Sequence, residues 1–108
     1  MVYGGEGGIP VYITEVRMRR IEGASKVVAV ASLTFDECFV VHEVKLLAGR
    51  EGRPFIAMPN RQLPSGDYLD VAHPITSETR QYIQEEMQRV YDDAVLQDRR
   101  EYRAYIAD

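Results

Sequence analysis

Residues 70–80 read DVAHPITSETR, and they mark the place where an extended run ends and a helix begins. Proline disfavours the helical backbone for the residue before it, so His73 should be extended and Pro74 should form a corner. A helix start carries unpaired N–H groups and the positive end of the helix dipole, and Arg80 adds a cation there. If the chain has an anion-binding site, we expect it at this junction.

The segment after this corner predicts a long amphipathic helix. It contains no glycine or proline, and Thr76 or Ser77 can cap its first turn. Residues 99–101 are charged and predict an exposed, frayed end, so the packing of the chain after Val95 stays open. Apolar residues recur at helical spacing in the order Ile83, Met87, Val90, Tyr91, Ala94, Val95 and then Tyr102 and Ile106.

The segments before the corner predict an antiparallel sheet. Arginines alternate with apolar residues near the end of residues 11–21, which indicates a strand with a basic outer face. A mostly apolar run at 27–35 suits a central strand covered on both sides, and 39–47 should form a hairpin with it. Two further strands are predicted at 55–58 and 68–72, the second after a type I turn at Leu63-Pro64-Ser65-Gly66. The predicted fold class is α+β: a five-strand antiparallel meander followed by a long C-terminal amphipathic helix.

Composition indicates one small domain over residues 9–108, preceded by a flexible glycine-rich leader over residues 1–8. The chain has 108 residues, no tryptophan and therefore a small core, so dimerisation would be a natural supplement. The single cysteine, Cys38, excludes an internal disulfide. Because no apolar run is long enough to span a bilayer, we expect a cytoplasmic protein without a membrane partner.

Charge is unevenly distributed along the chain. The net charge is −4, but residues 1–66 carry eight Lys or Arg and seven Asp or Glu, whereas residues 67–108 carry five and ten. A polyanion would therefore have to meet the N-terminal half and the helix start, with the rest of the helix turned away.

The titratable residues do not predict a catalytic or metal site. His42 and His73 are the only imidazoles, and their spacing from the carboxylates matches no ligand pattern. On a largely apolar strand face, His42 is more typical of a hydrogen-bonded core or interface histidine. No nucleophile, base and orienting group can be assembled, so we expect no enzyme, no metal and no cofactor.

Basic residues are the remaining candidates for function. Scattered arginines are usually solvated surface charges, and they become a binding site only where they are contiguous. A dimer would double any such patch. The candidates are Arg17, Arg19, Arg20, Lys45, Arg50, Arg53, Arg61 and Arg80.

Three motifs in register resemble a known family. They read Phe39-Val40-Val41-His42-Glu43-Val44, Phe55-Ile56-Ala57-Met58-Pro59, and Asp70-Val71-Ala72-His73-Pro74-Ile75 followed by Thr79-Arg80. Together they resemble the stage V sporulation protein G (septation regulator) family over residues 11–95. The resemblance implies a small antiparallel sheet with a C-terminal helix, a homodimer built by strand exchange or sheet extension, and DNA and RNA binding in bacterial regulation.

The resemblance also implies where nucleic acid binds. In this family binding is associated with the first helix turns and with basic positions in the preceding loop. Gln62 and Leu69 stand where many relatives carry Lys or Arg, and the second helix turn carries Glu85 and Glu86. Because each lost phosphate contact lowers affinity, we expect a Kd in the roughly micromolar range. The predicted nucleic-acid-binding residues are Arg61, Thr79, Arg80, Gln81 and Gln84, with Lys45, Arg50 and Arg53 as further basic positions.

Two functional hypotheses follow. The first is a non-enzymatic homodimeric regulator that binds DNA or RNA through Arg80, the helix start and neighbouring basic residues. Its strand-mediated dimer is expected to use the apolar strands 27–35 and 39–47, because an uncovered edge of this kind invites aggregation. The alternative is a protein-interaction module whose acidic helix face engages a partner.

Overall fold

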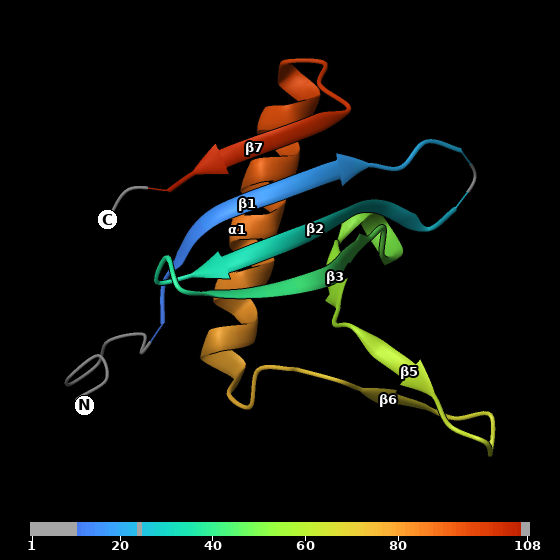
Figure 1. Cartoon of the computed structure of the whole chain (residues 1–108). Coiled ribbons are helices and arrows are strands. Elements are labelled where there is room, and N and C mark those ends of the chain that lie inside the picture. Colours follow the sequence, from blue (N-terminus) through green and yellow to red (C-terminus); the bar gives the residue numbers. More distant parts are fainter. Residues whose placement is uncertain (1–10, 24, 107–108) are drawn as a thin grey trace.

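In the computed structural model, which describes residues 11–23 and 25–106, a twisted antiparallel sheet lies against one long helix (Figure 1). The leader predicted over residues 1–8 lies outside the described residues. The predicted fold class, α+β with a five-strand antiparallel sheet and one long helix, is confirmed. The elements are β1 (Ile13–Arg20), β2 (Val27–Phe35), β3 (Phe39–Leu47), η1 (Arg50–Gly52), β4 (Phe55–Ala57), β5 (Asn60–Gln62), β6 (Tyr68–Asp70), α1 (Ser77–Leu96) and β7 (Glu101–Tyr105).

The strand order of the sheet is β4-β3-β2-β1-β7, so the apolar strand β2 is central as predicted. The prediction that β2 is covered on both sides is wrong, because α1 covers one face of the strand and the residues on its other face are only half-buried. The β2–β3 hairpin is confirmed. Its turn residues Asp36 and Glu37 both have positive φ, and the Cys38 N–H donates to the Phe35 carbonyl over 3.0 Å. This mirror-image turn matches the twist of the strands.

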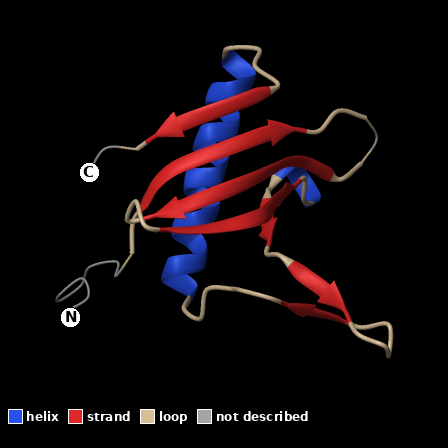
Figure 2. Cartoon of the chain, viewed as in Figure 1, coloured by secondary structure: helices blue, strands red, loops and turns tan. Residues whose placement is uncertain are grey.

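The fifth strand of the sheet is not the predicted one. Residues 68–70 pair with 60–62 in a separate two-stranded ribbon, which Figure 2 shows standing apart from the five-stranded sheet. The ribbon closes locally. Its turn is confirmed by the Gly66 N–H, which donates to the Leu63 carbonyl over 2.9 Å, and at its base the Val71 N–H donates to the Pro59 carbonyl over 2.7 Å. The meander therefore breaks at Pro59, where a ladder donor is missing.

The C-terminal segment supplies the missing strand, which corrects the prediction of a frayed helical end. The helix ends at Leu96, and the N–H groups of Asp98 and Arg99 donate to the Val95 and Ala94 carbonyls over 3.0 and 2.9 Å. This pair of bonds is a Schellman motif, with Asp98 at φ 52° in the left-handed position that glycine usually fills. The chain then reverses, and β7 pairs antiparallel with β1.

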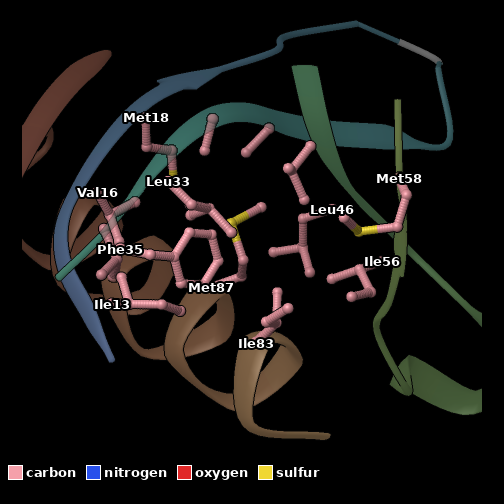
Figure 3. Close-up of a cluster of buried hydrophobic side chains, with 14 residues drawn as sticks. Ile13, Val16, Met18, Leu33, Phe35, Leu46, Ile56, Met58, Ile83 and Met87 are labelled. Atoms are coloured by element: carbon pink, nitrogen blue, oxygen red, sulfur yellow. The ribbon is translucent and has the colours of Figure 1, made fainter. Parts of the chain in front are cut away.

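The core lies between the sheet and α1. Side chains from the inner sheet face, such as Leu33 and Leu46, are fully buried against Met87 and Val90 of the helix. In Figure 3 the labelled side chains of both layers point toward one another. Since every second strand residue faces this core, the residues between them are left on the opposite face of the sheet. Among the described residues, no helix combines the length and the apolar character that a membrane span requires.

Candidate nucleic-acid interface

The helix begins at the corner that the sequence predicts. Thr76 is the N-cap, with extended backbone, and its hydroxyl oxygen accepts from the Thr79 N–H over 3.2 Å. The first backbone bond of the helix runs from the Arg80 N–H to the Thr76 carbonyl over 3.1 Å. The N–H groups of Ser77 and Glu78 precede that bond and have no carbonyl partner within the helix. Two donors and the positive end of the helix dipole therefore face outward at this point.

Arg80 stands one turn into this helix and is exposed. Within residues 11–23 and 25–106, the Arg80 guanidinium forms no ion pair, because the five pairs found there involve other residues. Arg89 on the same helix, by contrast, is held by Glu86, with its Nη2 at 2.6 Å from the carboxylate. The cation at the helix start is therefore available to an external anion, although Glu78 in the first turn partly offsets its field.

An apolar hollow of about 280 Å³ lies beside the helix start. Thr79 and Ile83 of α1 form one wall, and Phe39 and Val41 of β3 contribute to the other. Because residues of both elements line this hollow, the first half of β3 lies close to the helix start. A partner bound at the first half of β3 would therefore also contact the helix start. Its remaining lining residues are Val11, Phe35, Asp36, Cys38, Met58, Ala72, His73 and Pro74.

The other predicted binding residues lie in separate places. Gln81 is exposed and Gln84 half-buried in the first turns of α1, close to Arg80 in sequence, whereas Arg61 is exposed on the projecting ribbon. Arg50 and Arg53 are exposed in and after η1, beyond the far end of β3. Lys45 pairs in register with Val30 and Ala57, on the sheet face opposite α1. One copy of the chain therefore groups the helix-start residues and leaves the four other cations apart from them.

The two histidines are fixed by local hydrogen bonds. His42, predicted to be a hydrogen-bonded core or interface histidine, is hydrogen-bonded, with its Nδ1 2.7 Å from the Ser32 hydroxyl, but it is exposed and not in the core. His73 is exposed too, with its Nδ1 3.0 Å from the Pro74 carbonyl oxygen, as suits a rigid corner. In the described part of the chain, no three His, Cys, Asp or Glu side chains converge in a way that could hold a metal ion.

Tyr82 anchors the helix start to the sheet, a role that the sequence did not reveal. Its hydroxyl accepts from the Ile13 N–H over 2.8 Å. Burial raises the pKa of the Tyr82 hydroxyl above its ordinary value of 10.0, against the opposing effect of that hydrogen bond. The bond joins α1 to the first residue of β1 and so fixes the direction in which the helix start points.

The fold and this site define a small α+β domain with an exposed, cationic helix N-terminus. Residues 11–93 match the family model described as SpoVG. The chain is 49% identical over 80 residues to a protein of Clostridium novyi (strain NT), covering 74% of this chain and 79% of the relative. It is 43% identical over 83 residues to a protein of Caldicellulosiruptor bescii, covering 77% and 93%. Both relatives carry the name "Putative septation protein SpoVG".

The chain therefore belongs to the SpoVG family, the family that its three sequence motifs indicate. The family match ends at residue 93, within α1. The helix start lies inside the matched region, whereas the Schellman motif and β7 lie outside it.

Proposed function

We propose that this chain is a non-enzymatic, homodimeric regulator in septation or sporulation that binds DNA or RNA in the cytoplasm. Arg80 and the N–H groups of Ser77 and Glu78 contact backbone phosphates. The observation that carries this proposal is the exposed Arg80 guanidinium, without an ion pair among the described residues, beside a helix start whose first donors face outward. Charge and oriented N–H groups at one place are the chemistry that phosphate contacts require.

The same surface explains why we expect weak binding. Glu85 and Glu86 follow Arg80 within two helix turns. The other basic residues, Arg61, Arg50 and Arg53, lie on other elements of the chain. Few phosphate contacts give a Kd in the roughly micromolar range at physiological salt and a shallow salt dependence. Symmetric pairing of two copies would double the number of contacts along one backbone.

The proposed dimer is supported by an open edge on β3. Strand β4 pairs only with residues 45–47, so among the described residues the outer edge of β3 near Phe39 and Val40 has no partner strand. Phe39 is 63% exposed there. The predicted use of residues 27–35 as a dimer edge is wrong, because β2 is paired on both sides. Pairing of β3 with its copy would cover the apolar edge.

The nucleic-acid contact is tested by a charge reversal at Arg80 with a matched reversal at Arg89. Arg80→Glu should weaken binding of a labelled oligonucleotide by roughly tenfold or more and flatten its salt dependence. Arg89→Glu, on the same helix but already neutralised by Glu86, should change Kd by less than about threefold. Equal effects of the two reversals would contradict the assignment.

The dimer is tested by light scattering on Phe39→Lys. A lysine on an exposed edge position disfavours strand pairing without disturbing the core, so the variant should be monomeric at micromolar concentration. It should keep the circular dichroism spectrum of the folded protein, with a thermal midpoint lowered only by the loss of the dimer. A monomeric mass for the unaltered protein would refute the dimer.

The alternative, a protein partner on the helix, is supported by the outward side of α1, where Glu85 and Asp92 are exposed. It predicts binding of a partner protein that survives nuclease treatment and is lost in Glu85→Lys/Asp92→Lys. The nucleic-acid proposal predicts that this double reversal leaves binding intact or strengthens it.

A further inference from the structure

The sheet face opposite α1, here called the open face, carries a group of arginines at its β7 edge. Arg17 and Arg19 of β1 alternate with the buried residues Val16 and Met18, so they point away from the core. Arg103 of β7 is the register partner of Arg17 and points to the same side. These residues border a hollow of about 480 Å³. Its lining residues are Arg17, Met18, Arg19, Val30, Ala31, Ser32, Glu43, Arg99, Glu101, Tyr102 and Arg103.

The pairing of Arg17 with Arg103 is electrostatically unusual. Like charges directly opposite each other on neighbouring strands are destabilising, and an anion between them relieves the repulsion. Glu15 fills part of that role: its carboxylate lies 3.3 Å from Arg103 Nε and 4.0 Å from Arg17 Nε. One carboxylate thus serves two guanidinium groups, which leaves a net positive charge at this point.

The two other arginines of the hollow have no carboxylate partner. The side chains of Arg19 and Arg99 form no ion pair in residues 11–23 and 25–106. Glu101 is the register partner of Arg19, yet no contact within ion-pair distance forms between the two side chains. Four cations, set against the lining carboxylates Glu43 and Glu101 and the Glu15 carboxylate that pairs with Arg17 and Arg103, leave one net positive charge at the hollow of a chain whose net charge is −4.

This positive hollow is separate from the helix start. It lies on the open face, whereas α1 covers the other face of the sheet (Figure 1). Arg99 and Arg103 also come from the segment beyond residue 93, where the family match ends. The hollow therefore depends on a strand that lies beyond the matched region.

We propose that the open-face hollow is a second phosphate-binding site, and that its occupant is a single-stranded nucleic acid. A single strand is flexible enough to follow a concave sheet surface, whereas a rigid duplex could contact only its rim. Tyr105, 72% exposed on the same face, offers a ring on which a base can stack. The Arg103 guanidinium holds that ring in place, with Nη1 3.0 Å from the Tyr105 hydroxyl and Cζ 5.9 Å from the ring centre. This inference shares its ligand class with the proposed function but rests on different residues.

The test measures binding of an oligothymidine of about a dozen nucleotides by fluorescence anisotropy at several salt concentrations. Arg17→Gln/Arg103→Gln should raise Kd roughly tenfold and lower the slope of log K against log salt by about 1.4, the value for two lost contacts to a single strand. Arg89→Gln on the far side of the molecule is the matched control and should leave both unchanged. Thermal midpoints of all variants establish that β7 stays folded.

A variant that is expected to strengthen binding distinguishes a binding role of these arginines from a purely structural one. Glu15→Gln frees both Arg17 and Arg103, so it should tighten oligothymidine binding several-fold and steepen the salt slope. A purely structural role of the Glu15 ion pairs predicts no gain. No loss in the double arginine variant, or no gain in Glu15→Gln, would overturn the proposal.

Two further measurements fix the ligand and the independence of the site. If a glutamate homopolymer at equal ionic strength displaces the strand from the unaltered protein as well as excess oligothymidine does, the hollow is a general polyanion or acidic-peptide site and the proposal is wrong. If Arg80→Glu abolishes duplex binding while the double arginine variant leaves oligothymidine binding intact, only the helix-start site stands. The reverse result would remove the helix-start site and keep the open-face hollow.

Discussion

The two faces of the sheet differ in what covers them. The inner face is made of apolar side chains such as Leu33 and Leu46 and is sealed by α1. The open face of the same sheet presents Arg17, Arg19 and Arg103, and two of them share the Glu15 carboxylate. The first face obtains its stabilisation within the chain, whereas the second leaves charge available to a partner.

The inner face therefore contributes to stability, and the open face is free to contribute to binding. Strand alternation alone assigns each residue of β1 and β2 to one of the two faces. Substitutions on the inner face should therefore act on folding, and those on the open face or at the exposed helix start should act on binding.

The largest expected effect compares two residues of β2. Leu33 is fully buried, and Leu33→Ala should lower the free energy of unfolding by about 3 kcal/mol, because it leaves a cavity against the helix. Val30 is half-buried on the open face, and Val30→Ala should cost less than about 1 kcal/mol. Urea denaturation measures both. Similar losses would mean that the two faces are equally covered.

The next effect concerns the anchor between helix and sheet. Tyr82→Phe removes the acceptor for the Ile13 N–H and should cost about 1 to 2 kcal/mol in urea denaturation. Burial raises the pKa of Tyr82 in the folded state, so its contribution to stability is complete below pH 10.0, the ordinary value, and is lost as pH rises above it. The unaltered protein should therefore lose more stability above this pH than Tyr82→Phe does. Parallel pH profiles would show that the hydroxyl is not buried in solution.

A smaller effect is expected at the cap of α1. Thr76→Ala removes the hydroxyl that accepts from the Thr79 N–H and should cost about 1 kcal/mol. Ser77→Ala, one residue later and without a capping bond, is the control and should lie within about 0.5 kcal/mol of the unaltered protein. Thermal unfolding followed by circular dichroism distinguishes them. A larger loss in Ser77→Ala would place the cap at that residue.

The smallest effect is a gain at the end of the helix. Asp98 occupies a left-handed backbone position, and glycine adopts that position without the steric cost, so Asp98→Gly should stabilise the protein by about 0.5 kcal/mol. The lost contact to Arg20, 4.0 Å away and exposed, matters little. Asp98→Ala should be destabilising. If both variants destabilise the protein in the same urea assay, the Schellman motif does not form in solution.

Much of the fold could be predicted from local patterns. Alternating residues predicted β1 and β3, and a mostly apolar run predicted β2. The Pro74 corner with its capping threonine predicted the start of α1. The strand predicted at 68–72 shows what such patterns cannot predict, because it forms but pairs outside the sheet. Strand periodicity does not say which partner a strand pairs with. Residues 68–70 pair with 60–62 and not with the sheet, in a ribbon whose base is closed by the hydrogen bond from the Val71 N–H to the Pro59 carbonyl.

The sequence does contain a signal for the C-terminal strand. Glu101, Arg103 and Tyr105 alternate with half-buried Tyr102 and Ala104, a period of two that indicates a strand. The end of α1 before this strand could not be predicted, because an aspartate, Asp98, occupies the left-handed position where a glycine would mark a helix end. As a consequence, the helix-start residues could be predicted, but the open-face hollow could not, because it exists only when β7 lies beside β1.

The most direct test of the central claim is a titration of the ¹⁵N-labelled protein with a duplex oligonucleotide, followed by amide chemical shifts. The account predicts the largest shift changes at the amides of Ser77, Glu78 and Arg80, declining along α1. Changes confined to the outward helix residues around Glu85 and Asp92, with the helix-start amides unmoved, would contradict it.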